Sequence, residues 1–405
     1  MGLGKVMMDL CGKQNHCDLL PIQTFLRDLE NDETLVVQSC RSFESADVAE
    51  HFVSEIYRVE VTGFKKNEDK QQDYKKMLIV KCRLRNEAVV KEFNFEEVYK
   101  NEWLAYTRIL PILNKNASGD LPIPRCFYAD PTMLVLEDLS VLGYKTVDIV
   151  EPFTVQHVES TLCALAKLHS ASMIMEENDY ESLEALSVFT NDVVYNHGDV
   201  SNPAKYQKLN IDLAIAVFKE LGDSDENYSV LEKLNRLKDI CFDLQKKLVC
   251  TKRPYRVINH GDAWFNNIML KDGKAMLLDL QIMRFTSPAV DLSYFLYVNL
   301  KPSMRRENLD RFLDVYLENL EGVKRSKNWL VKEMKEFAVV GFINALWLLP
   351  LFYFKKEFLG ISQEMTRSDQ EYINMYLNNA SFYFKERLRE IVIDFFNHED
   401  CPLVL

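Results

Sequence analysis

The sequence predicts an α+β protein with a small antiparallel-sheet lobe in its N-terminal part and a larger, mostly helical lobe after it. Runs typical of strands are concentrated before residue 139, whereas the longer segments beyond it repeat their apolar residues with helical spacing. With 13 glycines and 12 prolines in 405 residues, the chain has few residues that interrupt long helices. We therefore expect two lobes, residues 1–138 and residues 139–405, with a ligand cleft between them.

The first strand pair is predicted between residues 55 and 84. Apolar side chains alternate with polar ones from Tyr57 to Val61, as on a half-buried strand. The charged run from Phe64 to Lys76 is expected to be a solvated hairpin loop, and the apolar run after it is expected to be the returning strand. Lys81 is a charge in the middle of that apolar strand. The mixed segments 22–31 and 44–54 are expected to be helical or irregular.

A helix over residues 92–110 is predicted next, and we expect Pro111 to end it. The apolar runs RCFYAD (125–130) and TMLVLEDL (132–139) predict another pair of strands. In the second lobe, Thr154 is the expected N-cap of the first long helix. Further helices are predicted over residues 205–222, 228–250, 306–322, 328–349 and 368–397, and strands at 255–259 and 275–280.

Charge and cysteine usage limit the classes of function. Lys and Arg number 49 and Asp and Glu number 61, which gives a net charge of −12 and argues against a general nucleic-acid binder. The 9 cysteines are odd in number and form no Cys-x-x-Cys pair, so neither a disulfide framework nor a zinc site is indicated. A cytoplasmic location is the expectation that follows.

One uncharged stretch, Phe337–Phe354, tests the expectation that no segment spans a membrane. Its length is at the lower limit for a transmembrane helix. Asn344 and Pro350 both oppose spanning, because their polar groups would need partners in lipid. We favour a buried helix of the core, with a membrane span as the alternative.

The strongest functional signal is a pair of motifs, HGDAWFNN and LLDLQ. Asp262 is followed by Asn267 and then by Asp279, which comes after a short apolar run. Phosphoryl transfer needs one carboxylate to accept the proton of the attacking hydroxyl, and an amide and a second carboxylate to hold the divalent ions that bind the nucleotide phosphates. The pattern therefore predicts a kinase-type site that uses ATP and Mg²⁺.

A second copy of the tripeptide, His197-Gly198-Asp199, has Ala204 where the asparagine is needed. No apolar strand that ends in aspartate follows it at the right distance, so we expect an ordinary loop there.

With these motifs, the chain resembles the ecdysteroid kinase-like family of insects, within the choline-kinase and aminoglycoside-phosphotransferase branch of the kinase fold. LVLEDLSVLGY (134–144), ALAKLHSAS (164–172) and SPAVDLSYFL (287–296) are similar to the same family in the same order. The likeness covers roughly residues 40–390 and implies a bilobal protein-kinase-like fold. Protein kinases would have arginine in place of Gly261 and Asp-Phe-Gly in place of Asp-Leu-Gln, which favours a small-molecule substrate.

The resemblance implies a role for each motif residue. Asp262 would be the catalytic base, and Asn267 and Asp279 would bind Mg²⁺. Asp291 is expected to anchor the catalytic loop through backbone N–H groups, and His260 to brace that loop.

The same resemblance implies a nucleotide site in the first lobe. Lys81 would contact the α- and β-phosphates, and Glu102 is the expected carboxylate partner of Lys81, with Glu97 and Glu96 as alternatives. The segment from Leu136 to Leu139 would be the hinge that offers backbone groups to adenine, and Glu137 and Leu139 are its expected binding residues.

The chain departs from the family pattern at residues 49–54. Family members have glycine at the position of Ala49, where the backbone lies over the phosphates, and alanine limits that approach. Ser54 is still expected to donate a hydrogen bond to the nucleotide.

The resemblance implies a kinase for a hydroxyl of a small lipophilic alcohol, such as an ecdysteroid or a foreign steroid, in steroid metabolism or detoxification. A choline or ethanolamine kinase is the alternative within enzymes. A pseudokinase that binds steroid or nucleotide without turnover is the alternative outside them. The sequence indicates neither an oligomeric state nor which hydroxyl is modified.

Overall fold

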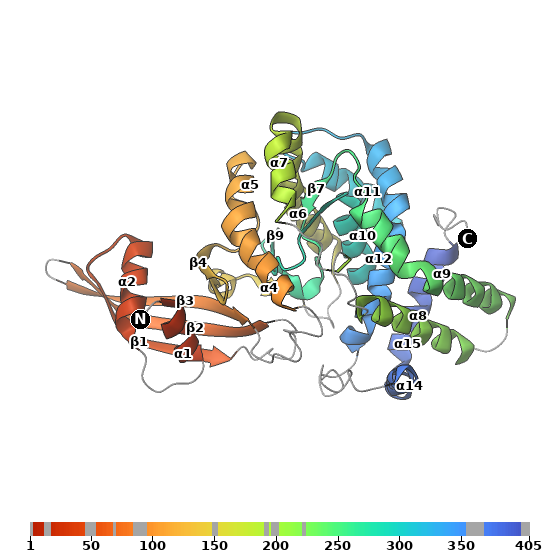
Figure 1. Ribbon diagram of the computed structural model, residues 1–405, viewed down its shortest axis with the longest axis horizontal. Coiled ribbons are helices and arrows are strands. Elements are labelled where there is room, and N and C mark those ends of the chain that lie inside the picture. The colour runs from red at the N-terminus through yellow and green to blue at the C-terminus, as the bar shows by residue number, and fades with distance from the viewer. Residues whose placement is uncertain are drawn as a thin grey trace.

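The computed structural model describes residues 3–11, 18–44, 54–67, 70–83, 95–147, 153–189, 194–195, 202–220, 224–353 and 368–397. Its N-terminal part is built on a five-stranded antiparallel sheet with the order β1-β2-β3-β5-β4 (Figure 1). The strands are β1 Leu35–Glu44, β2 Ser54–Asn67, β3 Lys70–Arg83, β4 Cys126–Asp130 and β5 Met133–Glu137. Helices α1 (Leu3–Cys11) and α2 (Leu19–Glu30) pack their apolar sides against this sheet.

For this sheet, one strand was not predicted and one prediction was wrong. No strand was predicted before residue 44, whereas β1 pairs with β2 from Leu35 to Glu44. The charged run 64–76 is not a loop, because β2 and β3 stay paired as far as Asn67 and Lys70. Backbone pairing needs no apolar side chains, and Lys76 also forms an ion pair with Glu30 of α2 at 2.5 Å.

The helix after the hairpin passes through Pro111 instead of ending there. Helix α4 (Phe95–Leu104) leads into a π-helical turn at Ala105–Ile109, and α5 (Leu110–Asn116) follows directly. Pro111 lies at the start of α5, directly after this π-helical turn.

The rest of the chain is mostly helical, as predicted, and Thr154 caps α6 through the His157 amide. The segment expected as one helix from 368 to 397 is two helices, separated at Ala380 and Ser381. The helices are α6 Val155–Asn178, α7 Tyr180–Ser187, α8 Asn202–Glu220, α9 Asp225–Cys250, α10 Ala289–Asn299, α11 Pro302–Glu318, α12 Lys327–Tyr353, α14 Asp369–Asn379 and α15 Phe382–Asn397. Short strands are β6 Lys145–Thr146, β7 Val257–Asn259, β8 Ile268–Lys271, β9 Lys274–Leu277 and β10 Arg284–Thr286.

Helix α12 contains most of the uncharged stretch and lies in the core. Phe337, Phe342 and Leu346 are buried on it. Across the described part of the chain, no helix has both the length and the apolar character needed to cross a membrane. Its apolar residues are therefore explained by contacts with neighbouring helices.

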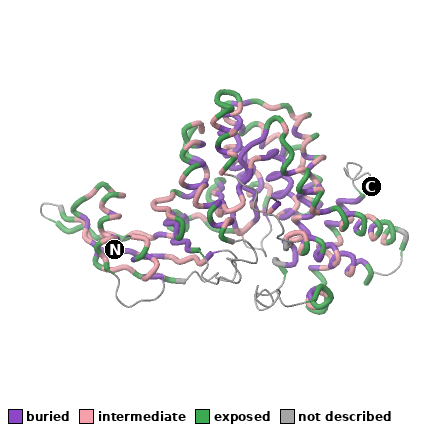
Figure 2. Tube along the Cα trace, viewed as in Figure 1, coloured by how far each residue is buried: buried purple, intermediate pink, exposed green. Residues whose placement is uncertain are grey.

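The buried residues form two clusters. One lies between the sheet and helices α1 and α2, and the larger one fills the helical part (Figure 2). Strand β5 contributes to both, since Met133 and Val135 belong to the first and Leu134 and Leu136 to the second. Successive side chains of β5 point to opposite faces of the sheet, so this strand contacts both clusters. The predicted α+β architecture is confirmed.

Candidate active site

Lys81 of β3 lies between two carboxylates from distant parts of the chain. Its Nζ is 2.7 Å from Glu102 Oε2 of α4 and 2.7 Å from Asp279 Oδ1 after β9. Of the three glutamates considered from the sequence, Glu102 is therefore the partner of Lys81. Glu96 instead pairs with Arg83, and Glu97 pairs with a lysine of its own helix.

Electrostatics favours a charged lysine here. Burial alone lowers the pKa of Lys81, but Asp279 and Glu102 outweigh burial and hold that pKa above its ordinary value. Burial also raises the pKa of Glu102, against the opposing effect of Lys81. One cation thus serves two carboxylates, and the cluster carries an excess of negative charge that a further cation would neutralise.

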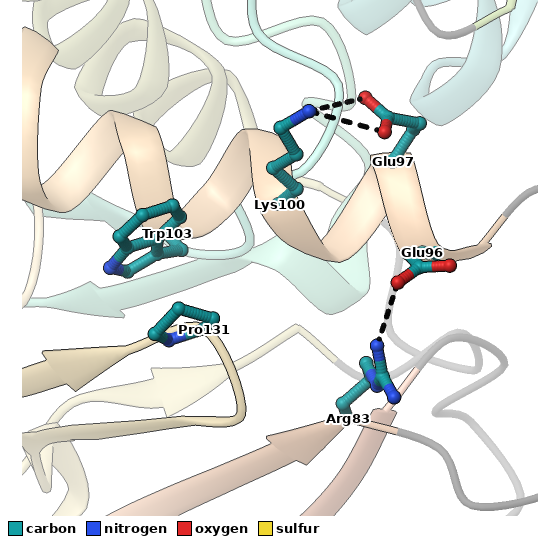
Figure 3. A pocket seen from close by; sticks show the side chains of 6 residues that line it. All are labelled: Arg83, Glu96, Glu97, Lys100, Trp103 and Pro131. Atoms are coloured by element: carbon teal, nitrogen blue, oxygen red, sulfur yellow. Dashed lines mark hydrogen bonds and ion pairs between the residues drawn. The ribbon is translucent and has the colours of Figure 1, made fainter.

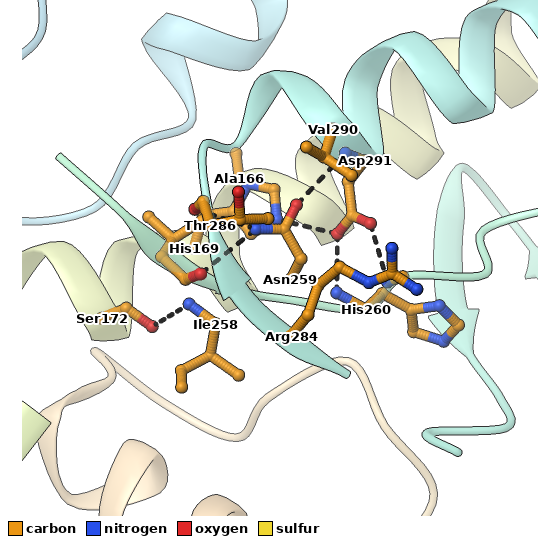
Figure 4. A network of polar contacts seen from close by, with 12 residues as sticks. Ala166, His169, Ser172, Ile258, Asn259, His260, Arg284, Thr286, Val290 and Asp291 are labelled. Atoms are coloured by element: carbon orange, nitrogen blue, oxygen red, sulfur yellow. Dashed lines mark hydrogen bonds and ion pairs between the residues drawn. The ribbon is translucent and has the colours of Figure 1, made fainter. Parts of the chain in front are cut away.

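Residues 260–267, which we call the Asp262 loop, are held by Asp291 of α10. The backbone N–H of His260 donates to Asp291 Oδ2 at 2.6 Å and that of Gly261 to Oδ1 at 2.7 Å, as the sequence predicts (Figure 4). His169 Nε2 donates to the same carboxylate at 3.0 Å. Burial opposes the charge, yet these donors hold the pKa of Asp291 below its ordinary value.

Gly261 is required by the backbone of this loop. Its φ is +89°, and a Cβ atom there would lie 2.1 Å from the carbonyl oxygen of Ile282. His260 braces the loop from within: its Nε2 donates to Leu278 O at 2.8 Å, and its Nδ1 accepts from the Asp262 amide at 3.2 Å. The predicted bracing role of His260 agrees with these contacts.

Asp262 is partly exposed and has a donor on each carboxylate oxygen. Asn267 Nδ2 donates to Oδ2 at 2.9 Å, and the Tyr294 hydroxyl of α10 donates to Oδ1. Burial raises the pKa of Asp262 to about 6, with Asp279 adding to the shift and the donors from Tyr294 and Asn267 opposing it. A carboxylate of this kind is ionised at neutral pH and accepts a proton more readily than an exposed aspartate does.

Two oxygens beside this carboxylate fit a divalent ion. Asn267 uses Nδ2 for Asp262, and among the described residues its Oδ1 accepts no hydrogen bond. Asp279 uses Oδ1 for Lys81, and its Oδ2 likewise has no donor within the described ranges. Asp279 also has a φ of +66°, a left-handed conformation that is uncommon outside glycine and that aspartate adopts more readily than most residues. Mg²⁺ prefers such a site, with few protein oxygens and the rest from phosphate and water.

The remaining predicted residues lie on or directly after the two strands that flank β3 and make no such cluster. Ser54 is buried at the start of β2, opposite Arg83 on β3. Glu137 ends β5, and Leu139 is buried in the next turn, where its carbonyl accepts from the Tyr144 amide at 3.2 Å. Residues 49–53 and 197–199, on which two further predictions were made, lie outside the described residues.

Sequence reasoning missed Tyr294 and Asn101 as parts of this site. Asn101 Nδ2 donates to Gln281 O at 3.2 Å and so joins α4 to the segment after Asp279. Tyr294 follows Asp291 by three residues on one helix, and residues at that spacing share a face. That spacing was the available signal for Tyr294, whereas the contact of Asn101 had none.

Helix α4 also lines a cavity of about 200 Å³ away from these residues (Figure 3). Trp103 and Pro131 form one part of its wall, and the ion pairs of Glu96 and Glu97 form another. Glu96 and Glu97, the alternative partners considered for Lys81, line it, and the other predicted site residues do not.

Comparison with known proteins identifies one family. A model of the ecdysteroid kinase-like family matches residues 48–328. No curated protein matches the chain.

Solved structures give weaker likenesses. Choline kinase from Cryptosporidium parvum Iowa II is 12% identical with a TM-score of 0.47, over 95% of this chain and 98% of that one. An ethanolamine kinase of Plasmodium vivax is 14% identical with a TM-score of 0.43, over 93% and 95%. A streptomycin–ATP–APH(2″)-IIa ternary complex is 15% identical with a TM-score of 0.40, over 88% and 99%. Values this low give no information on the substrate of this chain.

Proposed function

Since the chain belongs to the ecdysteroid kinase-like family, we propose that it is an ATP- and Mg²⁺-dependent kinase for a hydroxyl group of a small lipophilic alcohol. The fold is protein-kinase-like, and the chain is a phosphotransferase of the small-molecule kinase type. An ecdysteroid or another steroid alcohol is the acceptor that the family suggests.

The observation that carries the proposal is the position of Lys81, 2.7 Å from both Glu102 and Asp279. A buried lysine shared by two carboxylates is costly unless charge is needed there. Binding of a nucleotide with its metal ion would explain these charges, because the lysine would bind phosphate oxygens and Asp279 would bind the metal.

Each residue then has one task. When bound, ATP supplies the phosphoryl group and Mg²⁺ neutralises charge on its phosphate oxygens. Asn267 Oδ1 and Asp279 Oδ2 would hold the ion, and Lys81 would donate to phosphate. Asp262 would take the proton of the acceptor hydroxyl on a carboxylate oxygen.

The adenine and phosphate contacts belong to the same proposal. Backbone groups between Glu137 and Leu139 would bind adenine, and Ser54 would donate to phosphate. We propose a division at residues 138 and 139 between this nucleotide-binding lobe and a helical lobe, 139–405, that holds the Asp262 loop and the acceptor.

The lipophilic character of the acceptor is taken from the family. Trp264 and Phe265 follow Asp262 closely, but Trp264 is buried in the helical core and Phe265 packs against that core.

The test is ADP formation by purified protein with Mg²⁺ and ATP, with and without ecdysteroids, plant steroids, choline and aminoglycosides. We expect a steroid to stimulate turnover and Asp262→Asn to lower it about 10²- to 10⁴-fold, the usual contribution of a general base. Asp272→Asn is the matched control, because Asp272 is exposed and its left-handed backbone also suits asparagine.

Nucleotide binding separates the alternatives. Lys81→Met should weaken Mg²⁺-dependent ATP binding, measured by calorimetry, while Asp262→Asn should preserve it. Stimulation by choline alone would reassign the acceptor to the choline and ethanolamine class. Absence of nucleotide binding in the unmodified protein would contradict the kinase proposal and favour a binding protein on a kinase scaffold.

A further inference from the structure

Asp138, which lies between Glu137 and Leu139, accepts four hydrogen bonds although its side chain is only 2% exposed. Its Oδ1 accepts the amide of Ser140 at 3.0 Å and the hydroxyl of the same serine at 2.6 Å. Arg58 of β2 binds the carboxylate with two donors, Nη2 to Oδ1 at 3.1 Å and Nε to Oδ2 at 2.6 Å. The family resemblance implies no role for either of these two charged side chains.

The ion pair lies on the face of the sheet that carries Lys81. In the register of β2 and β3, Ile56 is opposite Lys81 and Arg58 is opposite Ile79, and residues opposite one another share a face. The other face packs against α1 and α2. Strand β3 lies between β2 and β5, so Arg58 reaches across β3 to the residue that follows β5. The pair therefore joins three strands on the side of the proposed phosphate-binding lysine.

The backbone after β5 depends on the same carboxylate. Asp138 is the N-cap of a short 3-10 helix, Leu139–Leu142, and its carbonyl accepts the Val141 amide at 3.3 Å. Leu139 is 3% exposed, yet within the described ranges its amide donates no hydrogen bond. A buried amide without an acceptor is costly, and a bound ligand can supply the acceptor. Because this amide belongs to the planar peptide bond that follows Asp138, the contacts of Asp138 fix its orientation.

We propose that Arg58 and Asp138 are positioning residues for adenine: the ion pair holds the backbone between Glu137 and Leu139 in the arrangement that binds the edge of the base. This inference rests on the proposed kinase function, because that function supplies the nucleotide. An exposed ion pair would contribute little, but Asp138 is buried, and two parallel donors from one guanidinium fix direction as well as distance.

The first measurement compares ligands with and without the base. Calorimetry gives the Kd of ATP, of GTP and of tripolyphosphate, each with Mg²⁺, for the unmodified protein and for Arg58→Met. The Arg58 side chain is 41% exposed, so its replacement opens no cavity in the core. We expect the Kd of ATP to rise about 10-fold, the effect of about one hydrogen bond, and that of tripolyphosphate to change less than about 2-fold. The preference for ATP over GTP should fall, because a less ordered backbone distinguishes the two bases less well.

Two further variants define the contact. Arg58→Lys retains the charge but not the pair of parallel donors, so we expect a smaller rise in the Kd of ATP, about 3-fold. Lys75→Met is the matched control, because Lys75 pairs with Glu60 across the same hairpin and is 62% exposed. We expect this control to bind all three ligands as the unmodified protein does. If Arg58→Met does not fold, Arg58→Lys carries the same comparison.

The second measurement needs no nucleotide. Hydrogen exchange followed by NMR reports the amides of Ser140 and Val141, whose acceptors both belong to Asp138. We expect these two amides to exchange about 10-fold faster in Arg58→Met, because their acceptors are then held less firmly. In Lys75→Met their exchange should be unchanged.

The outcomes separate this inference from the kinase proposal. If the unmodified protein binds neither ATP nor tripolyphosphate, both are overturned. If the unmodified protein binds ATP and Arg58→Met binds it equally well, or loses ATP and tripolyphosphate to the same extent, the inference alone is overturned. Unchanged exchange of the Ser140 and Val141 amides in Arg58→Met would also overturn it, because the ion pair would then not hold this backbone.

Discussion

Asp262 lies within the Asp262 loop and Asp291 holds that loop from α10, and the surroundings of the two carboxylates differ. Asp291 accepts two backbone N–H groups and one histidine and is completely buried. Asp262 is partly exposed, accepts two side-chain donors and lies near the further negative charge of Asp279. The pKa of the first is lowered and that of the second is raised to about 6. Asp291, which has more donors, thus serves structure, and Asp262 keeps the capacity to exchange a proton.

The largest effect is expected from removing the structural carboxylate. Asp291→Ala leaves the N–H groups of His260 and Gly261 and the ring of His169 without an acceptor. We expect the free energy of unfolding at pH 7.5 to fall by about 3–5 kcal/mol, the cost of breaking a buried charged network. Urea unfolding measures it, with Asp239→Asn, at an exposed position, as the control. A loss below about 1 kcal/mol would contradict the structural role of Asp291.

Gly261, which directly precedes Asp262, should give the next largest effect. Gly261→Ala combines a positive φ with a contact of 2.1 Å to Ile282 O, for which we expect a loss of about 2–4 kcal/mol. Gly273→Ala is the matched control, because its φ is +74° and the nearest atom to a Cβ there is 3.6 Å away. Equal losses in thermal unfolding would mean that backbone conformation, and not the close approach, fixes the loop.

A smaller effect of opposite sign is expected at Asp262. Since its folded pKa of about 6 lies above the ordinary 3.8, the folded state binds a proton more tightly, and stability falls as pH rises between these values. Asp262→Asn should therefore be more stable than the unmodified protein at pH 7.5, by about 1–2 kcal/mol after allowance for its partial exposure, and should lose this advantage near pH 4. Asp291 has the reverse dependence: its stabilisation is present above the unfolded pKa and disappears as pH falls through the folded one.

Chemical denaturation of Asp262→Asn at both pH values tests this sign. Asp272→Asn, which is exposed, should show no difference between them. A stability advantage that grows toward pH 4 would contradict the raised pKa of Asp262.

The smallest effect is expected one contact beyond Asp291. The Tyr316 hydroxyl donates to His169 Nδ1 at 2.9 Å, which leaves Nε2 of that ring to donate to Asp291. Tyr316→Phe should cost about 1 kcal/mol, one buried neutral hydrogen bond, in urea unfolding. The exposed Tyr383→Phe serves as its control. A loss as large as that of Asp291→Ala would mean that Tyr316 fixes the ring that completes the network.

The sequence was most informative where chemistry and local spacing coincide. Asp262, Asn267 and Asp291 could be expected near one another from their motifs, because these residues belong to one loop and to the helix that holds it. The sequence left open which of Glu96, Glu97 and Glu102 is the partner of Lys81, because the answer depends on which face of α4 points toward β3.

Other features had no local signal or an opposing one. Strand β1 mixes polar residues into its pattern and is defined by its pairing with β2. The charged end of the β2–β3 hairpin was predicted as a loop from its polar side chains. The strands nevertheless continue there, because backbone hydrogen bonds form between polar residues as well as between apolar ones. Asn101 reaches Gln281 across 180 positions, which no spacing rule covers.

The π-helical turn at Ala105–Ile109 decides how the site responds to a change of chain length. Such a turn contains one more residue than the α-helical turn it replaces. Deletion of a single residue within the turn would therefore restore a regular α-helix and leave Glu102 facing Lys81. Deletion of a residue between Glu102 and the turn would instead rotate Glu102 by about 100° relative to α5, with a shift of about 1.5 Å, and separate it from Lys81 although every ionisable residue of the site remained.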